Sequence, residues 1–147
     1  MAKKIASKTG KLQYVQIREI AFTYLIPDDI EFPEENEDTI QFDMEIVKML
    51  SQEEEMIRLI FTINLKVEVK DKKEAKSTYS TEHLFKVGNF SELVKRTDDH
   101  FEVNEALDKT ITGLAYSTIR GLFLQRFKGT WFSDFILPIT KPSELRG

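Results

Sequence analysis

Hydrophobic and polar residues alternate over two neighbouring stretches in the first half of the chain. In the first stretch, every second residue is apolar: Ile40, Phe42, Met44 and Ile46. In the second, the same spacing continues over a longer set: Ile57, Leu59, Phe61, Ile63, Leu65, Val67 and Val69. A period of two is typical of a strand with one buried and one solvated face. The short acidic stretch 51–55 between the two runs predicts a hairpin that joins them.

Two further stretches, 14–25 and 79–87, are rich in β-branched and aromatic residues, which favours strands. Within 14–25 the apolar parity changes at Arg18-Glu19, which predicts a β-bulge. The lysine-rich stretch 70–76 predicts a solvated turn before the fourth strand. We expect these two strands to flank the central pair, and the short or polar links predict an antiparallel meander.

The second half of the chain changes to helical spacing. Apolar residues recur three or four positions apart: Val103, Leu107, Ile111, Leu114, Ile119, Leu122 and Phe123. Asn104 is a favourable N-cap, and Gly129 after Lys128 is a natural C-terminal stop. The pattern therefore predicts a long helix over roughly 104–128. Four antiparallel strands followed by a long helix place the chain in the α+β class.

Composition narrows the class of protein further. The 147 residues suit a single domain, 1–147, with 1–11 expected to be a flexible tail. The net charge of 21 − 25 = −4 argues against a nucleic-acid-binding surface, which needs a basic face. Without cysteine, disulfides and thiolate metal sites are excluded. No secretory signal or apolar run of about 20 residues is visible, so we expect a cytoplasmic protein that does not insert into a membrane.

Catalytic chemistry finds little support in the sequence. His83 shares its parity with the apolar Phe85, so we expect a packed, hydrogen-bonded histidine rather than a general base. His100 follows Asp98-Asp99 in a polar loop, where three adjacent side chains cannot easily converge on a metal ion. No glycine-rich loop follows a strand and opens a helix. We therefore expect no enzymatic activity, no cofactor and no metal site.

Small residues form a stripe on the predicted helix. Gly113, Ser117 and Gly121 are spaced four apart and so share one face. Each interior glycine costs about 1 kcal/mol of helix stability relative to alanine. Two of them on one face suggest that another backbone approaches closely, and the charged residues of this helix favour a soluble oligomer interface over a membrane pair. The alternative is that the glycines are merely tolerated on a solvated face.

Several large apolar residues lie outside the predicted strands and helix. Four aromatic residues are prominent among them: Phe32, Phe90, Trp131 and Phe132. Some of these apolar residues must complete the hydrophobic core. The apolar surface of the others exceeds what a small monomer exposes to water. The excess implies an oligomer, an apolar binding groove, or both.

Short motifs in the second half resemble SecB, the bacterial export chaperone. They are Tyr-Ser-Thr-Ile-Arg at 116–120, Gly-Thr-Trp at 129–131 and Leu-Pro-Ile at 137–139. Residues 18–22 are similar to the first strand of that family, and 88–90 to the end of its fourth strand. The resemblance spans roughly 12–145, although Ala115 stands where the family has a proline.

The resemblance implies a homotetramer, built as a dimer of dimers with long helices between sheets, and a crossover loop over 90–101. It implies a non-enzymatic, ATP-independent chaperone that holds non-native polypeptide clients in apolar grooves, for which the four aromatic residues are the candidates. It also implies transfer of clients to the SecA motor. Glu19 matches one acidic SecA-docking position, but the second, four residues on, is Thr23. Relatives of this fold serve antitoxins, so a chaperone dedicated to one such partner is the alternative.

Overall fold

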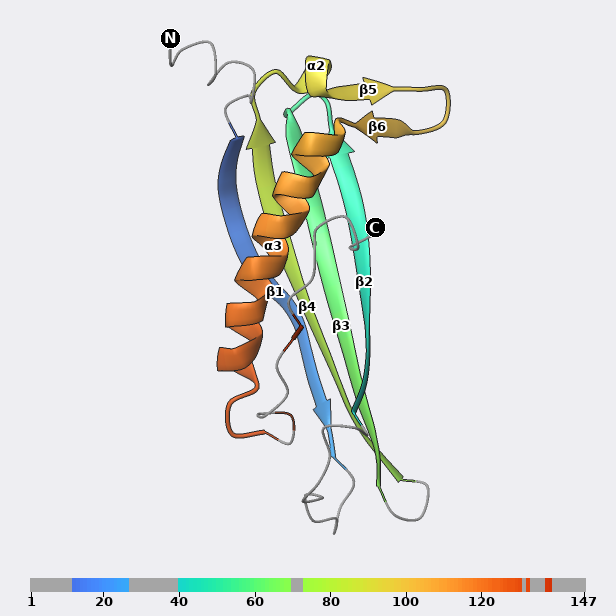
Figure 1. Ribbon diagram of the computed structural model, residues 1–147, viewed down its shortest axis with the longest axis vertical. Helices are drawn as coiled ribbons and strands as arrows, with labels where there is room; N and C mark the ends of the chain where they lie inside the picture. The colour runs from blue at the N-terminus through green and yellow to red at the C-terminus, as the bar shows by residue number, and fades with distance from the viewer. Residues whose placement is uncertain (1–11, 27–39, 70–72, 131, 133–136, 139–147) are drawn as a thin grey trace.

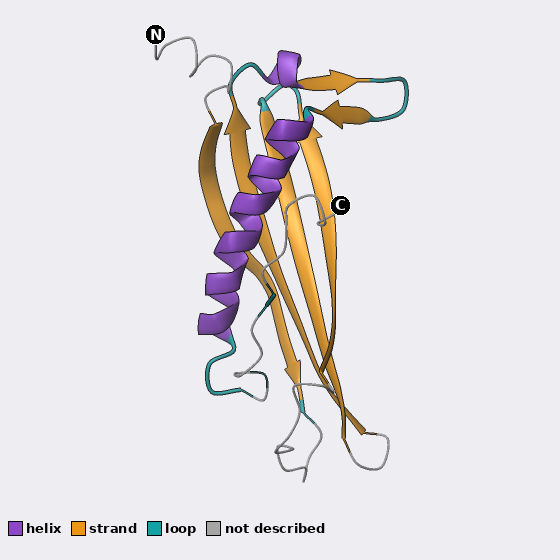
Figure 2. Cartoon of the chain, viewed as in Figure 1, coloured by secondary structure: helices purple, strands orange, loops and turns teal. Residues whose placement is uncertain are grey.

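The computed structural model describes residues 12–26, 40–69, 73–130, 132 and 137–138. Four long strands form one antiparallel sheet: β1 (Leu12–Leu25), β2 (Ile40–Ser51), β3 (Met56–Val69) and β4 (Lys73–Val87). The chain continues through a short helix, a small hairpin and a long helix: α2 (Phe90–Leu93), β5 (Val94–Arg96), β6 (Phe101–Val103) and α3 (Glu105–Arg126). The predicted α+β class, with four strands followed by a long helix, is confirmed (Figures 1 and 2).

The order of strands in the sheet is β1-β4-β3-β2. The predicted meander therefore holds for β2, β3 and β4, but β1 pairs with β4 and not with β2. We expected β1 and β4 to flank the β2–β3 pair. This expectation is wrong, because β4 and β1 both lie on the β3 side of the pair. As a consequence, β1 and β2 form the two opposite edges of the sheet.

Strand β4 begins earlier than the sequence predicts. The stretch 70–76 was expected to be a turn, but β4 starts at Lys73, and Lys76 already pairs with Lys66 of β3. Glu74 explains why this lysine-rich stretch can be a strand. Its carboxylate binds Lys66 across the strands at 2.9 Å and Lys76 at 3.2 Å, which reduces the repulsion between the two paired lysines.

Strand β1 contains two irregularities in its pairing with β4. One lies between Glu19 and Ala21, beside the predicted bulge at Arg18-Glu19, which is thereby confirmed. A second lies between Tyr14 and Gln16. Each shift leaves one residue of β1 without a partner and changes which face the following side chains occupy.

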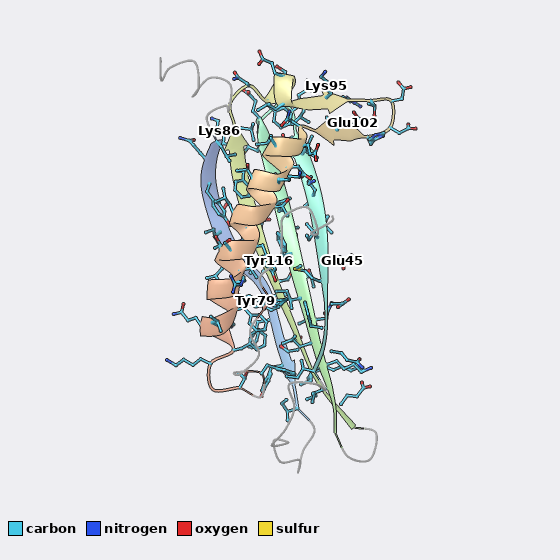
Figure 3. The ribbon with its side chains drawn as sticks, in the orientation of Figure 1. Glu45, Tyr79, Lys86, Lys95, Glu102 and Tyr116 are labelled. Atoms are coloured by element: carbon cyan, nitrogen blue, oxygen red, sulfur yellow. The ribbon has the colours of Figure 1, made fainter. Side chains whose placement is uncertain are left out.

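Helix α3 runs along one face of the sheet, over β1 and β4 (Figure 1). Its buried residues are spaced three or four apart: Leu107, Ile111, Ala115, Ile119 and Phe123. They face the buried set of the sheet, which alternates along β3 and β4: Ile57, Leu59, Phe61, Ile63, Leu65, Tyr79 and Phe85. Figure 3 labels Tyr79 and Tyr116, which come from β4 and α3 and are both buried. The helical spacing of α3 and the alternation of β3 and β4 thus place their apolar side chains in the same core layer.

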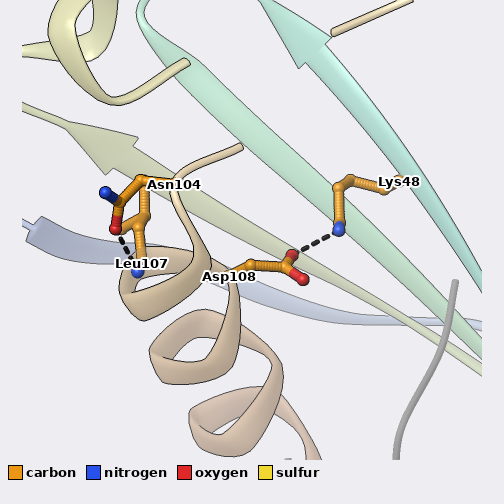
Figure 4. A network of polar contacts seen from close by, with 4 residues as sticks. All are labelled: Lys48, Asn104, Leu107 and Asp108. Atoms are coloured by element: carbon orange, nitrogen blue, oxygen red, sulfur yellow. Dashed lines mark hydrogen bonds and ion pairs between the residues drawn. The ribbon is translucent and has the colours of Figure 1, made fainter. Parts of the chain in front are cut away.

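Both ends of α3 follow from local chemistry. The Asn104 side chain accepts a hydrogen bond from the Leu107 backbone nitrogen at 3.1 Å, which confirms the predicted N-cap (Figure 4). Asp108 in the first turn binds Lys48 of β2 and ties the start of the helix to the sheet. The helix ends at Arg126, slightly before the predicted 128, and Gly129 adopts a left-handed φ of 82° in the turn that follows.

The segment after α3 is fastened to the helix through backbone carbonyls. The Tyr116 hydroxyl donates to the carbonyl of Pro138 at 2.5 Å, and Arg120 Nε donates to that of Leu137 at 3.2 Å. The Leu137 side chain is buried in the core. Two of the motifs that resemble SecB, 116–120 and 137–139, therefore lie in contact through these residues.

Candidate functional site

Two of the four aromatic residues predicted to line a groove belong to the core. Phe90 is 2% exposed and Phe132 is 1% exposed, so neither offers apolar surface to a ligand in this protomer. Phe132 packs edge-on against Phe127, with ring centroids 6.2 Å apart. Phe32 and Trp131 lie outside the described residues, and their role as polypeptide contacts stays a prediction.

Among the described residues, the exposed large hydrophobic side chains lie instead on the two edge strands and on α3. The exposed large hydrophobic residues are Val15, Ile17, Ile20 and Leu25 of β1, Phe42, Val47 and Met49 of β2, and Leu114 and Leu124 of α3. The sequence contained a signal for the position of Val47 and Met49 on β2. Val47 and Met49 share the parity of the polar Asp43 and Glu45, so strict alternation already placed them on the face away from the helix.

The small-residue stripe of α3 lies on the helix face away from the sheet. Ser117 and Gly121 are exposed, and Gly113 is half-buried. A Cβ atom built on Gly121 would meet nothing within 4 Å. No close neighbour within the described part of the protomer therefore requires glycine at this position. Leu124, seven residues after Ser117, adds exposed apolar surface to the same face.

Glu19, the predicted SecA-docking residue, faces α3. Its carboxylate binds Arg126 Nε at 3.1 Å, and the Arg126 guanidinium lies 4.3 Å from the centre of the Phe22 ring. Burial, and after it the charge of Glu19, raises the pKa of Tyr79 in the same region. Glu19 pairs with Thr81 on the helix side of the sheet. Its charge is therefore engaged within the protomer.

Thr23, the second position of the acidic pattern, lies on the other face of the sheet. Its partner in β4 is Thr78, whose parity is opposite to that of the buried Tyr79. Thr78 donates its backbone N–H to Thr23 Oγ1 at 3.2 Å. The pairing shift between Glu19 and Ala21 changes the parity of β1, so positions 19 and 23 do not share one face.

The face of the sheet opposite α3 is polar near its centre. Glu82 of β4 binds Arg18 of β1 at 3.0 Å and Arg58 of β3 at 3.3 Å. The Glu82 side chain is nearly buried, and its two cationic partners offset the cost of removing the carboxylate from water. Beside it, the hydroxyls of Thr62 and Ser80 share a hydrogen bond of 2.9 Å. The exposed apolar side chains on this face lie toward its two edges, at Leu25 of β1 and at Val47 and Met49 of β2.

The histidines carry no sign of a reactive site. His83 is fully buried, and its ring nitrogens bind the hydroxyl of Tyr14 and that of Thr81, the latter at 2.8 Å. Burial lowers the pKa of His83 to about 4, so the ring is neutral near pH 7. The predicted packed, hydrogen-bonded histidine is confirmed. His100 is exposed and contacts Thr97.

Metal-binding clusters and membrane-spanning helices are both absent from the described residues. No group of three or more histidine, aspartate or glutamate side chains in them is arranged to hold a metal ion. No helix among them is long and apolar enough to span a bilayer.

Comparison with known proteins gives a similarity of fold. No protein-family model and no curated protein matches the chain. Among solved structures, it is similar to the SecB-like chaperone Rv1957 of Mycobacterium tuberculosis, in complex with a ChAD peptide from the Rv1956 HigA1 antitoxin. The TM-score is 0.53 at 12% identity, over 94% of each chain. A protein of unknown function from Streptococcus agalactiae has a TM-score of 0.42 at 8% identity, over 81% of this chain and 89% of that one. The first similarity confirms the SecB-like fold.

Proposed function

We propose that this chain is a SecB-like chaperone that binds non-native polypeptide without ATP, has no enzymatic activity and needs no cofactor. The observation that carries the proposal is the exposure of apolar side chains along both edge strands of a SecB-like sheet. Val15 and Ile20 on β1 and Val47 and Met49 on β2 are examples. We place the protein in the cytoplasm, where non-native chains are first exposed to chaperones.

The mechanism we propose is holding by many weak contacts. An extended client that touches several apolar patches binds each successive patch at a high effective concentration, so the total affinity exceeds that of any single contact. Such contacts need no defined client sequence. Because Phe90 and Phe132 are buried, we assign the holding to the exposed edge-strand residues, together with Phe32 and Trp131 as predicted contributors.

We further propose that the chain acts as a homotetramer, a dimer of dimers. The outer face of α3 supports this proposal, because a Cβ atom at Gly121 would meet no described residue within 4 Å, and Leu114 and Leu124 are exposed beside it. Small residues let two helices approach closely, and the flanking leucines would be buried on association. An assembly through Gly113, Ser117 and Gly121 would also multiply the number of client-binding edges.

A second candidate function is service to a single partner such as an antitoxin. It is favoured by one observation, namely that the similar Mycobacterium tuberculosis chaperone is in complex with an antitoxin peptide.

The transfer of clients to SecA, which the resemblance to SecB implies, has less support in the structure. Glu19 is already paired with Arg126, and Thr23 supplies no charge. We therefore expect weak, salt-sensitive SecA binding.

The proposal is tested by suppression of aggregation. The purified protein should keep a chemically unfolded client soluble without nucleotide, and a client bound near Trp131, the single tryptophan, should change its fluorescence. If no client is protected, the general chaperone proposal fails. Co-purification from the native cell separates the two candidates: many unrelated chains support a general chaperone, and one stoichiometric partner supports a dedicated one.

A further inference from the structure

Apolar side chains gather on the sheet face opposite α3, at the end of the sheet where β2 ends and β3 begins. They are Val47 and Met49 of β2, Met56 and Ile60 of β3, and Leu84 of β4. Val47 lies opposite Ile60, and Met49 lies opposite Arg58, which has Leu84 on its other side. Val47 and Met49 are exposed, and the other three are half-buried. We call these five residues the outer-face patch.

The border of the outer-face patch is acidic. The three glutamates of the turn 53–55 are exposed, and so is Glu45, two residues before Val47 on the same face. None of these four carboxylates has an ion pair among the described residues. Arg58, within the patch, is already bound to Glu82. The patch therefore fits a ligand with apolar side chains next to cationic ones.

The first eleven residues of the chain have this complementary composition. Residues 1–11 contain no acidic residue and four lysines, at positions 3, 4, 8 and 11. Without these four lysines, residues 12–147 have a net charge of 17 − 25 = −8. Ile5 and Ala6 lie between the lysines and supply the apolar part. The segment and the rest of the chain therefore attract each other electrostatically.

The point where this segment joins β1 lies at the same end of the sheet as the patch. The strand pairings give one row across the sheet at this end: Gln13, Lys86, Met56 and Ser51. Neighbouring strands are about 4.8 Å apart, so β2 lies about 14 Å from β1 across the sheet. An extended chain advances about 3.3 Å per residue, so the seven steps from Leu12 back to Ile5 span about 23 Å. Ile5 can therefore reach the patch.

The cations near β1 favour one position for the segment on this face. Lys86 of β4 is exposed next to Gln13 and has no ion pair among the described residues. It repels the lysines of the segment from the β1 side. The glutamates of the turn 53–55 and Glu45 attract them toward β2 and β3. Figure 3 labels Lys86 on β4 and Glu45 on β2.

We propose that residues 1–11 dock across the outer-face patch of their own chain. Ile5 lies against the patch, and Lys3 and Lys4 lie beside the glutamates of the turn 53–55. Docking removes from water an apolar surface that the sheet otherwise exposes. This inference goes beyond the proposed function, because the docking needs no client. Since Val47 and Met49 are also proposed client contacts, a bound client and the docked segment compete for them.

The test places a nitroxide spin label on the full-length protein at Ala6→Cys. Because the chain contains no cysteine, the label is confined to this position. The nitroxide broadens the NMR signals of amides that it approaches. We expect the amides of 47–49 and 56–60 to lose intensity. Raising the ionic strength from about 0.1 to 1 M shortens the Debye length from about 10 to 3 Å, so the loss should become smaller.

Matched variants locate the contact. Met49→Lys places a cation in the patch and should restore the intensity of the 56–60 amides. Leu25→Lys makes the same change at an exposed side chain of this face, at the far end of β1, and should leave the broadening unchanged. The variant Lys3→Glu/Lys4→Glu alters the segment and leaves the sheet intact. It should also abolish the broadening, which keeps the test decisive if Met49→Lys disturbs β2.

Three outcomes would overturn the proposal. The first is broadening confined to the start of β1, and the second is patch broadening that persists in Lys3→Glu/Lys4→Glu. The third comes from a mixture of spin-labelled protein with isotope-labelled protein that lacks the spin label. Patch broadening in that mixture would show that the segment comes from a second copy. Aggregation suppression is measured separately, so its failure would refute the proposed function and leave the docking result unaffected.

Discussion

Replacing Gly121 with leucine should stabilise the protomer and weaken its assembly. Residue 121 is exposed, lies inside α3, and a Cβ atom there meets nothing within 4 Å. The leucine side chain therefore has room in the isolated protomer. Glycine is about 0.8–1.0 kcal/mol less favourable than alanine in a helix interior, and leucine is nearly as good as alanine. We expect the free energy of unfolding of the monomer to rise by about 1 kcal/mol.

In the assembly, the same substitution should be unfavourable. If the stripe formed by Gly113, Ser117 and Gly121 contacts another helix, the added side chain must be accommodated between two backbones. Overpacking of this kind costs about 1–3 kcal/mol, which weakens association by roughly 5- to 150-fold at each contact. Gly121→Ala is the matched control, because it restores helix propensity with only one added carbon atom. It should keep most of the assembly.

Sedimentation equilibrium and urea unfolding measure the two effects separately. The expected result is a leucine variant that dissociates at concentrations where the wild type is tetrameric, yet unfolds at higher urea as a monomer. A wild type that is monomeric at micromolar concentration would refute the assembly argument. Unchanged association of the leucine variant would show that Gly121 lies outside the interface. Lower stability of its monomer would mean that the position is packed within the protomer.

Three further predictions concern the core, acid stability and the sheet face. Phe132→Ala should cost about 3–5 kcal/mol of unfolding free energy, measured by urea titration, because the ring is fully buried; a loss below about 1 kcal/mol would contradict a core role. Burial lowers the pKa of His83 from 6.5 to about 4, so between these values the unfolded chain binds a proton that the native state does not. Stability should therefore fall by about 3 kcal/mol as the pH drops from about 6.5 to 4, and His83→Gln should flatten that profile in urea titrations. Thr23→Glu should strengthen SecA binding in a low-salt titration if the face opposite α3 is the docking surface, and tight, salt-resistant binding by the wild type would argue against our expectation.

Local patterns were sufficient for the four long strands and the long helix, but not for the pairing of the strands. They also missed α2 and the β5–β6 hairpin, which lie where a crossover loop was expected over 90–101. The alternation in 40–46 and 57–69 predicted β2 and β3, and the parity change at Arg18-Glu19 predicted an irregular β1. The pairing of β1 with β4 was missed, because contacts between strands distant in sequence leave no periodic signal. The early start of β4 was missed for a related reason. Lys76 looks like a turn residue until Glu74 and the opposing strand, with Lys66 opposite it, are seen beside it.

The residues of the candidate site were likewise only partly predictable from local sequence patterns. Aromatic residues outside regular elements were expected to line a groove, but Phe90 and Phe132 close the core. Loop residues carry no periodicity from which burial can be read. Val47 and Met49 share the parity of the polar Asp43 and Glu45, a signal that the sequence analysis did not use, and both lie on the side away from α3. That signal could not show that their strand lies at an edge.

The sequence by itself determined the four long strands, the long capped helix, the buried parity of β2, β3 and β4, and the absence of thiol chemistry. These follow from local preferences and from the period of the pattern, which any neighbouring structure must respect. The tertiary structure alone decided that β1 and β2 are the edges, that Glu19 is engaged by Arg126, and that Gly121 has no close neighbour in the part of the protomer that the structure describes. The physical reason is that pairing, burial and free surface are properties of groups brought together from distant parts of the chain.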